Sequence, residues 1–194
     1  TSSGNAFFVS DQPEPEGIYS RSKLEAEQGL WALEAETGME VVVIRPPLVY
    51  GPEVTGNFGS LLRWLKYGVP LPFGAINNRR SLVALDNLVD LIVTCIDYPS
   101  AANQTFLVSD GEDLSTTQLL RLTASALGVP VRLFPVPAPL LDVGFRLLGK
   151  SGLSLRLLES LQVDIATTQE TLGWTPPLSV EEGLRRAAEP LRQR

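Results

Sequence analysis

A tyrosine and a lysine lie four residues apart at the start of a predicted helix. In the run YSRSK, Tyr19 and Lys23 are separated by about one helical turn, so their side chains share one face. An ammonium group beside a phenol favours the phenolate form. A tyrosine in that setting can exchange a proton with a sugar or alcohol hydroxyl, so the pair predicts general acid–base chemistry.

The composition excludes several other kinds of chemistry. The chain has no histidine and one cysteine, Cys95, so histidine-based catalysis, an internal disulfide and a Cys/His zinc site are excluded, and no metal site is predicted. Cys95 lies in an apolar run and is predicted to be a small core residue. The net charge of -6 argues against a nucleic-acid partner, which requires a basic surface.

Hydropathy gives no sign of a membrane span. No apolar run approaches the roughly 18 residues that a spanning helix needs, and no signal-peptide pattern opens the chain, so we expect a cytoplasmic protein. Residues 139–148 are very apolar and could form a helix on a membrane surface. Their short length and low charge instead favour burial within the domain.

Predicted helices and strands alternate along the chain, which indicates an α/β architecture. Residues 41–44, VVVI, are typical of a strand buried on both faces in a parallel sheet. Asp86 is a predicted N-cap, and Ser115 with Gln118 and Ser179 with Glu182 have the spacing of capping boxes. Further strands are predicted over 80–85 and 104–108, short extended segments over 131–134 and 160–164, and helices over 20–37, 58–67, 87–97, 115–127, 139–148, 165–172 and 179–191.

Three sequence blocks stand out along the chain. The first is YSRSKLEAE at residues 19–27, and the second is VIRPPLVYGP at residues 43–52. The third is LGWTPP at residues 172–177, in which Trp174 is expected to pack in the core. Together they resemble the extended short-chain dehydrogenase/reductase family, and in particular its NAD-dependent nucleotide-sugar epimerase/dehydratase branch. The resemblance covers essentially the whole chain, but only the C-terminal portion of such an enzyme.

The resemblance implies a partial Rossmann-like, NAD(P)-binding domain joined to a smaller α/β substrate-binding domain. Residues 1–48 are assigned to the C-terminal remnant of the Rossmann domain and residues 49–194 mainly to the substrate domain, and it stays open whether strand 104–108 returns to the Rossmann sheet. The glycine-rich turn that holds a dinucleotide is not found, because Gly51, Gly56 and Gly59 have the wrong spacing. We therefore expect the chain alone to lack turnover.

The resemblance also implies roles for individual residues around the cofactor, which is NAD or NADP with NAD preferred. Tyr19 would be the general acid/base, and Lys23 would hydrogen-bond the nicotinamide ribose. Pro46 and Pro47 would pass along the nicotinamide. Ser3 is a candidate for the serine that orients the substrate oxygen, and the alternative is a serine upstream of the chain.

The substrate that the resemblance implies is a nucleotide-diphosphate sugar, with a UDP-sugar preferred. Asn57, Arg80 and Arg156 are the candidate substrate ligands, because an arginine donates paired hydrogen bonds to phosphate and keeps its charge. Arg79 is a weaker candidate. Asn57 can equally be a helix N-cap, and Arg80 can be a residue of a solvated turn. Leu48 stands where many relatives carry an asparagine, which affects one diphosphate contact.

We interpret the chain as a fragment of an NAD(P)-dependent nucleotide-sugar epimerase, dehydratase or 4-ketoreductase. It would act at sugar C4 by hydride transfer with the Tyr/Lys pair, in surface polysaccharide synthesis. Two alternatives stay open: a non-catalytic nucleotide-sugar-binding or dimerisation module, and a related 3-beta-hydroxysteroid or dihydroflavonol-type reductase. A homodimer through the helix at residues 20–37 is expected.

Overall fold

The computed structural model describes residues 6–15, 17–53 and 56–192, and it contains both helices and strands as predicted, which alternate up to residue 127 and are followed by helices only. The α/β class is therefore confirmed. The helices are α1 (Gly17–Thr37), α2 (Gly56–Lys66), α3 (Leu85–Asp97), α4 (Thr116–Leu127), α5 (Ala138–Leu147), α6 (Ser151–Leu158), α7 (Ala166–Leu172) and α8 (Val180–Arg192), with the 3₁₀ turn η1 (Pro99–Ala101). The strands are β1 (Val42–Arg45), β2 (Leu48–Tyr50), β3 (Arg80–Ala84), β4 (Gln104–Leu107) and β5 (Asp113–Leu114).

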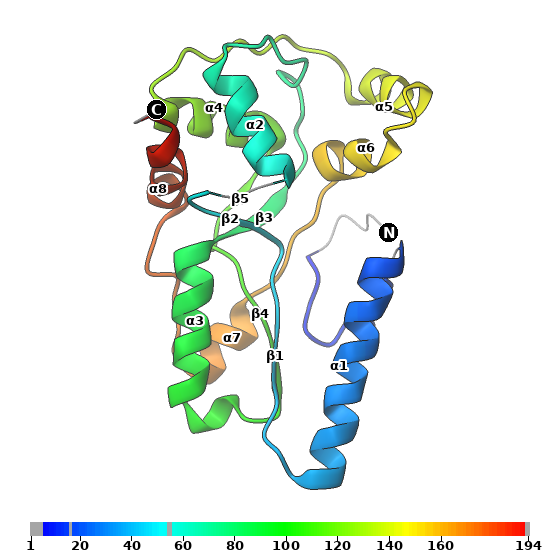
Figure 1. The fold of residues 1–194 in the computed structure, drawn as a ribbon, viewed down its shortest axis with the longest axis vertical. Helices are drawn as coiled ribbons and strands as arrows, with labels where there is room; N and C mark the ends of the chain where they lie inside the picture. The colour runs from blue at the N-terminus through cyan, green and yellow to red at the C-terminus, as the bar shows by residue number, and fades with distance from the viewer. Residues whose placement is uncertain (1–5, 16, 54–55, 193–194) are drawn as a thin grey trace.

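The strands form two small sheets. In the first, β1 and β4 run parallel, with Val42 opposite Gln104. The second has the order β2-β3-β5, in which β2 and β3 are parallel and β5 is antiparallel to β3. Helix α1 lies on one side of β1 and β4, α3 and α7 lie on the other, and α2, α4 and α8 gather around the second sheet (Figure 1). The division into a dinucleotide domain and a substrate domain stays a prediction.

Each sheet has its own hydrophobic core. The larger core joins the second sheet to α2, α4 and α8, and the smaller core joins α3, β4 and α7. Cys95 is buried in the smaller core, as predicted. Trp174 packs there as well, and its indole N–H donates to Asp90 Oδ1 at 2.7 Å, so its predicted packing role is confirmed.

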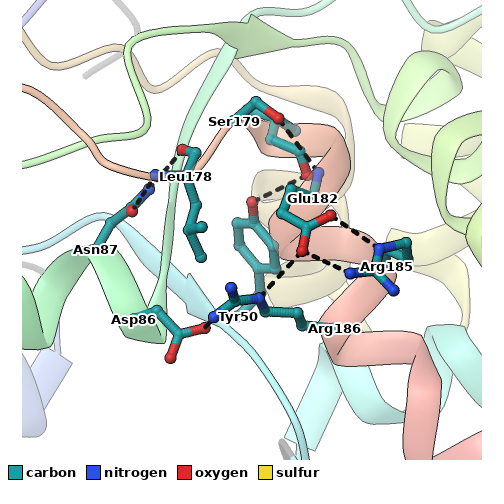
Figure 2. A network of polar contacts seen from close by, with 9 residues as sticks. Tyr50, Asp86, Asn87, Leu178, Ser179, Glu182, Arg185 and Arg186 are labelled. Carbon is teal, nitrogen blue, oxygen red and sulfur yellow. Dashed lines mark hydrogen bonds and ion pairs between the residues drawn. The ribbon is translucent and has the colours of Figure 1, made fainter.

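A buried carboxylate, Asp110, joins the elements between the two sheets. It accepts hydrogen bonds from the Tyr50 phenol at 2.6 Å, the Ala84 backbone N–H at 2.8 Å and the Asn87 side-chain amide at 2.7 Å. Burial raises the pKa of Asp110 although these bonds oppose the shift, and burial also raises the pKa of Tyr50. Asn87 exchanges two further bonds of 2.9 Å with the backbone of Leu178 (Figure 2).

The predicted cap of α3 is wrong. The helix begins at Leu85, so Asp86 lies within its first turn, and Ala84 is the N-cap residue, which makes no side-chain cap bond. Asp86 instead accepts a hydrogen bond from Arg186 of α8 at 3.2 Å (Figure 2). A carboxylate in the first turn still interacts favourably with the positive end of the helix dipole.

The two predicted capping boxes have different outcomes. The Ser115/Gln118 box is complete in both directions, and Gly128 ends α4 in the left-handed conformation with φ of 71°. At α8, the Ser179 hydroxyl accepts from the Glu182 backbone N–H at 3.3 Å, but the Glu182 carboxylate pairs with Arg185 and Arg186 (Figure 2). The second box is therefore only half formed.

Helix α5 forms where expected, but the prediction that it is buried within the domain is wrong. No residue of α5 is buried, although its inner side packs on the larger core through Leu141 and Phe145. Its outer side is apolar and exposed, with Leu147 82% exposed. Helix α6 was not predicted, and residues 131–134 form a single β-bridge, from Leu133 to Leu71, in place of a strand.

Across residues 6–15, 17–53 and 56–192, no helix has both the length and the hydropathy that crossing a bilayer requires.

We predict that Tyr50→Phe destabilises the fold by about 1–3 kcal/mol, because the buried Asp110 carboxylate loses a donor. Urea unfolding of the full-length protein that contains this chain measures the change. The matched control is Tyr98→Phe, which alters a tyrosine that is 46% exposed and should stay within about 0.5 kcal/mol of wild type. Equal effects of the two substitutions would contradict the role of the Asp110 network.

We also predict that Gly183→Ala in α8 lowers stability by about 1–3 kcal/mol, since the new Cβ would lie 2.5 Å from the Tyr50 hydroxyl and 3.0 Å from the Ala84 Cβ. The control is Gly29→Ala in α1, where a Cβ meets open space. Higher helix propensity should there add about 0.5–1 kcal/mol. A stabilising Gly183→Ala would show that α8 packs less tightly on β2 and β3 than described.

Candidate active site

A cleft of about 650 Å³ opens between the first turns of α1, the segment of residues 6–15, and α6. Four of the residues predicted from the sequence line it together: Tyr19, Lys23, Arg80 and Arg156. They come from three elements that are far apart in the chain. Residues of α1 and of α6 both line the cleft, and α6 lies above the N-terminal end of α1 in Figure 1. The remaining lining residues are Phe7, Pro13, Glu14, Pro15, Ser20, Leu24, Leu155, Glu159, Ser160 and Leu161.

Tyr19 and Lys23 face each other on α1 as their spacing predicts. The Lys23 ammonium lies over the Tyr19 ring, 5.6 Å from the ring centroid. Tyr19 is 75% exposed, so its hydroxyl is accessible to a ligand in the cleft. The position of α1 on β1 is fixed two turns further on, where Glu27 accepts two hydrogen bonds from the Arg45 guanidinium at 2.5 and 3.2 Å. This bidentate pair is only partly exposed and holds the helix that carries Tyr19 against the sheet.

Arg80 begins β3 and has fixed partners, which excludes its interpretation as a solvated turn residue. Its Nη1 donates to the backbone oxygens of Glu159 at 2.9 Å and Leu155 at 3.4 Å, at the C-terminal end of α6. Burial lowers the pKa of the Arg80 guanidinium, which still keeps its charge at neutral pH. Asn78 supports the same end of α6, donating to the oxygens of Leu157 at 3.3 Å and Glu159 at 2.9 Å. Arg80 therefore positions one wall of the cleft as well as lining it.

The cleft carries more positive than negative side chains. Lys23, Arg80 and Arg156 contribute three cations, whereas Glu14 and Glu159 contribute two carboxylates. Arg156 is exposed on α6, so its guanidinium can adjust to a ligand. An anionic group such as a diphosphate would find paired donors here.

A second hollow of about 550 Å³ adjoins the cleft and is lined by Pro46 and Pro47, the two predicted cofactor contacts. The two spaces share four lining residues, Phe7, Pro13, Glu14 and Leu161. Phe7 is held in place by a hydrogen bond of 2.8 Å from its N–H to the Gln162 oxygen. The segment of residues 6–15 therefore forms the partition between the two spaces.

The other candidates fall into two groups: Ser3 and the Asn57 side chain are not described by the structure, and the rest are not lining residues of the cleft. Ser3 lies outside the residues that the structure describes, and Asn57 lies in the first turn of α2, where its side chain is not described. Arg79 and Leu48 are both exposed and are not among the residues found to line the cleft. Gly51 has a packing role, because a Cβ there would come within 2.9 Å of the Leu85 Cβ.

Sequence reasoning missed the part of the cleft that α6 and the following residues provide. Leu155, Glu159, Ser160 and Leu161 line the wall opposite Tyr19. The available signal was the apolar run LSLRLL at residues 153–158, which has enough leucines for a short helix. Within the described residues, no group of acidic or cysteine side chains could hold a metal ion.

Comparisons with known proteins give the chain a family. The sequence model of the NAD dependent epimerase/dehydratase family matches residues 3–109. The UDP-glucose 4-epimerase of Vibrio cholerae is 52% identical over 187 residues, which are 96% of this chain and 57% of the relative. An N-acetyl-alpha-D-glucosaminyl-diphospho-ditrans,octacis-undecaprenol 4-epimerase of Escherichia coli O157:H7 is 27% identical over 189 residues, covering 91% of this chain and 57% of the relative.

The fold is shared with solved structures as well. The UDP-glucuronic acid 4-epimerase of Bacillus cereus, crystallised with UDP-glucuronic acid and NAD, superposes with a TM-score of 0.76 at 16% identity, covering 100% of this chain and 58% of that one. The chain thus spans about half the length of the curated relatives it matches. Because the family match extends over more than half of the residues, the chain belongs to the NAD dependent epimerase/dehydratase family.

Proposed function

We propose that this chain provides the proton-transfer group and the substrate cleft of an NAD-dependent nucleotide-sugar 4-epimerase. The observation that carries the proposal is the convergence of Tyr19, Lys23, Arg80 and Arg156 on one cleft from three separate elements. The 52% identity to a UDP-glucose 4-epimerase favours epimerisation over dehydration or reduction. The assignment of residues 1–48 and 49–194 to a dinucleotide domain and a substrate domain forms part of this proposal.

In this proposal Tyr19 moves the proton of the sugar 4-hydroxyl. Its exposed side chain takes the proton in the phenolate form as C4 is oxidised, and returns it from the resulting phenol as C4 is reduced on the other face. The Lys23 ammonium, which lies over the ring, would stabilise the negative charge of the phenolate before it takes the proton and again after it returns it. NAD, when bound, would accept the hydride from C4 and return it.

The residues present fit the nicotinamide end of NAD. Lys23 offers an ammonium donor, and Pro46 and Pro47 line the hollow beside the cleft. Neither proline has a peptide N–H. The Lys23 ammonium would bind the nicotinamide ribose. Residues 6–15 between the two spaces would keep the sugar and the cofactor side by side, so that C4 faces the nicotinamide.

The proposed substrate is a UDP-sugar whose diphosphate lies near Arg80 and Arg156. Arg80 is held rigid by the backbone of α6, whereas Arg156 is exposed and can close on the bound anion. A second candidate is a sugar diphosphate carried on a polyprenol, as in the name of the Escherichia coli relative. What favours it is the exposed apolar side of α5, next to the α6 wall of the cleft.

A role in surface polysaccharide synthesis and a homodimer through α1 complete the proposal. Helix α1 has no buried residue along its length, and Leu30 and Leu33 are 42% and 40% exposed. This exposed apolar surface is compatible with packing against the same helix of a second copy.

We predict that Tyr19→Phe in the full-length protein lowers kcat for 4-epimerisation of a UDP-sugar by about 10²–10⁴-fold, since the proton-transfer group is lost. Binding of the UDP-sugar, measured by calorimetry, should change little because the ring and Lys23 remain. Tyr67→Phe is the control, because Tyr67 lies at the end of α2, is 78% exposed and is not a lining residue of the cleft. A Tyr19→Phe enzyme with unchanged kcat would remove the proposed mechanism.

We also predict that Arg156→Gln raises KM for the UDP-sugar by about tenfold or more, with little change in kcat, because a charged hydrogen bond to the diphosphate is lost in ground state and transition state alike. Arg79→Gln removes an exposed arginine of the same protein that does not line the cleft, and should leave KM unchanged. Equal KM values for wild type and Arg156→Gln would exclude the diphosphate role. Parallel assays with a polyprenyl-diphosphate sugar decide between the two substrates.

A further inference from the structure

We propose that the outer side of α5 is a contact surface for an anionic lipid membrane. The surface consists of Leu140, Val143, Leu147 and Leu148, which we call the α5 patch. Their exposed fractions are 64%, 54%, 82% and 72%. Exposure of large aliphatic side chains to water is unfavourable in free energy. Their burial in the boundary region of a bilayer removes this unfavourable contribution.

The α5 patch lies opposite the side of α5 that packs on the protein. Leu141 and Phe145 belong to the inner side, and the Phe145 ring stacks on Phe73 with a centroid distance of 6.4 Å. Leu140, Val143 and Leu147 follow at spacings of three and four residues, so they form a single stripe on the outer side. The helix is therefore apolar on both sides, whereas an ordinary surface helix has a polar outer side.

Two exposed basic residues, Arg146 and Lys150, adjoin the α5 patch in the chain, and the acidic residue of α5, Asp142, has partners in Arg146 and in Ser154 of α6. The side chain of Arg146 is 71% exposed, and Lys150 follows directly after the helix and is exposed. Asp142 accepts a hydrogen bond of 2.6 Å from Ser154 of α6 and pairs with Arg146 at 2.9 Å. Residues 131–159 carry four basic and two acidic side chains, a net charge of +2, in a chain with a net charge of -6.

This charge distribution identifies the kind of surface that fits. An apolar stripe bordered by arginine and lysine matches a bilayer with anionic headgroups, where the aliphatic side chains enter the boundary region and the cations meet the headgroups. The acidic remainder of the chain, with a net charge of -8 outside residues 131–159, would be repelled by the same headgroups. The repulsion would orient the protein so that α5 faces the membrane.

The position of α5 connects this surface to the cleft. Helices α5 and α6 form a corner of the molecule, on the same side as the N-terminal end of α1 (Figure 1). Leu155 and Arg156 of α6 line the cleft, and Leu155 is 45% exposed. A membrane against the α5 patch would therefore lie beside the α6 wall of the cleft. The membrane contact itself does not depend on which substrate the cleft binds.

The test is vesicle flotation of the full-length protein with phosphatidylcholine alone and with phosphatidylcholine mixed with phosphatidylglycerol. We expect the wild type to float with the mixed vesicles and much less with the neutral ones. The double variant Leu140→Glu/Leu147→Glu should reduce the bound fraction by about tenfold or more. The control is Tyr67→Glu, which places the same charge at a residue that is 78% exposed outside the α5 patch, and it should bind like wild type.

Further measurements on the double variant show why its binding to vesicles changes. Circular dichroism and activity on a soluble UDP-sugar should be unchanged in the double variant, so loss of the membrane contact is distinguishable from failure of the proposed function. Analytical ultracentrifugation reports whether the double variant separates a dimer, which would assign the α5 patch to a second copy and overturn the proposal. Equal flotation of the double variant and the wild type, or no flotation of the wild type with either vesicle, would also overturn it.

Discussion

The cleft depends on the hydrogen bonds that Asn78 and Arg80 donate to the C-terminal carbonyls of α6. The last carbonyls of a helix have no partner within it, and here the side chains of Asn78, just before β3, and of Arg80, its first residue, supply donors to the oxygens of Leu155, Leu157 and Glu159. The short helix α6 is thereby fixed over the sheet, and Arg156 is placed on the wall that faces α1. Arg80 also lines the cleft, and its guanidinium is part of that attachment.

The opposite wall is held by a different interaction. Helix α1 has no buried residue, so hydrophobic packing alone contributes little to its position among the described elements. The bidentate pair between Glu27 and Arg45 ties the helix to β1, two turns beyond Tyr19. Two polar attachments, one on each wall, therefore define the space in which Tyr19 and Lys23 meet the arginines, while the buried Asp110 network sets the two sheets relative to each other.

The predictions from sequence succeeded where the signal is local and failed where it depends on distant contacts. The four-residue spacing of Tyr19 and Lys23 and the capping box at Ser115 are properties of one helix each, and both appear as predicted.

The start of α3 was predicted in the wrong place. The Ala84 backbone N–H donates to Asp110, and with Ala84 anchored in this way the helix can begin at Leu85 without a side-chain cap. Helix α5 was expected to be buried because the segment is short and carries little charge, and only the fold shows that one side is uncovered. Helix α6 depends on contacts from Asn78 and Arg80, some 75 residues earlier in the chain, which no local pattern reports.

The most direct test of the account is a crystal structure of the full-length protein with NAD and a UDP-sugar bound. The account predicts that the sugar 4-hydroxyl lies within hydrogen-bonding distance of the Tyr19 hydroxyl, that the diphosphate contacts Arg80 or Arg156, and that the nicotinamide lies beside Pro46 and Pro47. A sugar bound elsewhere on the protein, or bound in the cleft with C4 turned away from Tyr19, would contradict it.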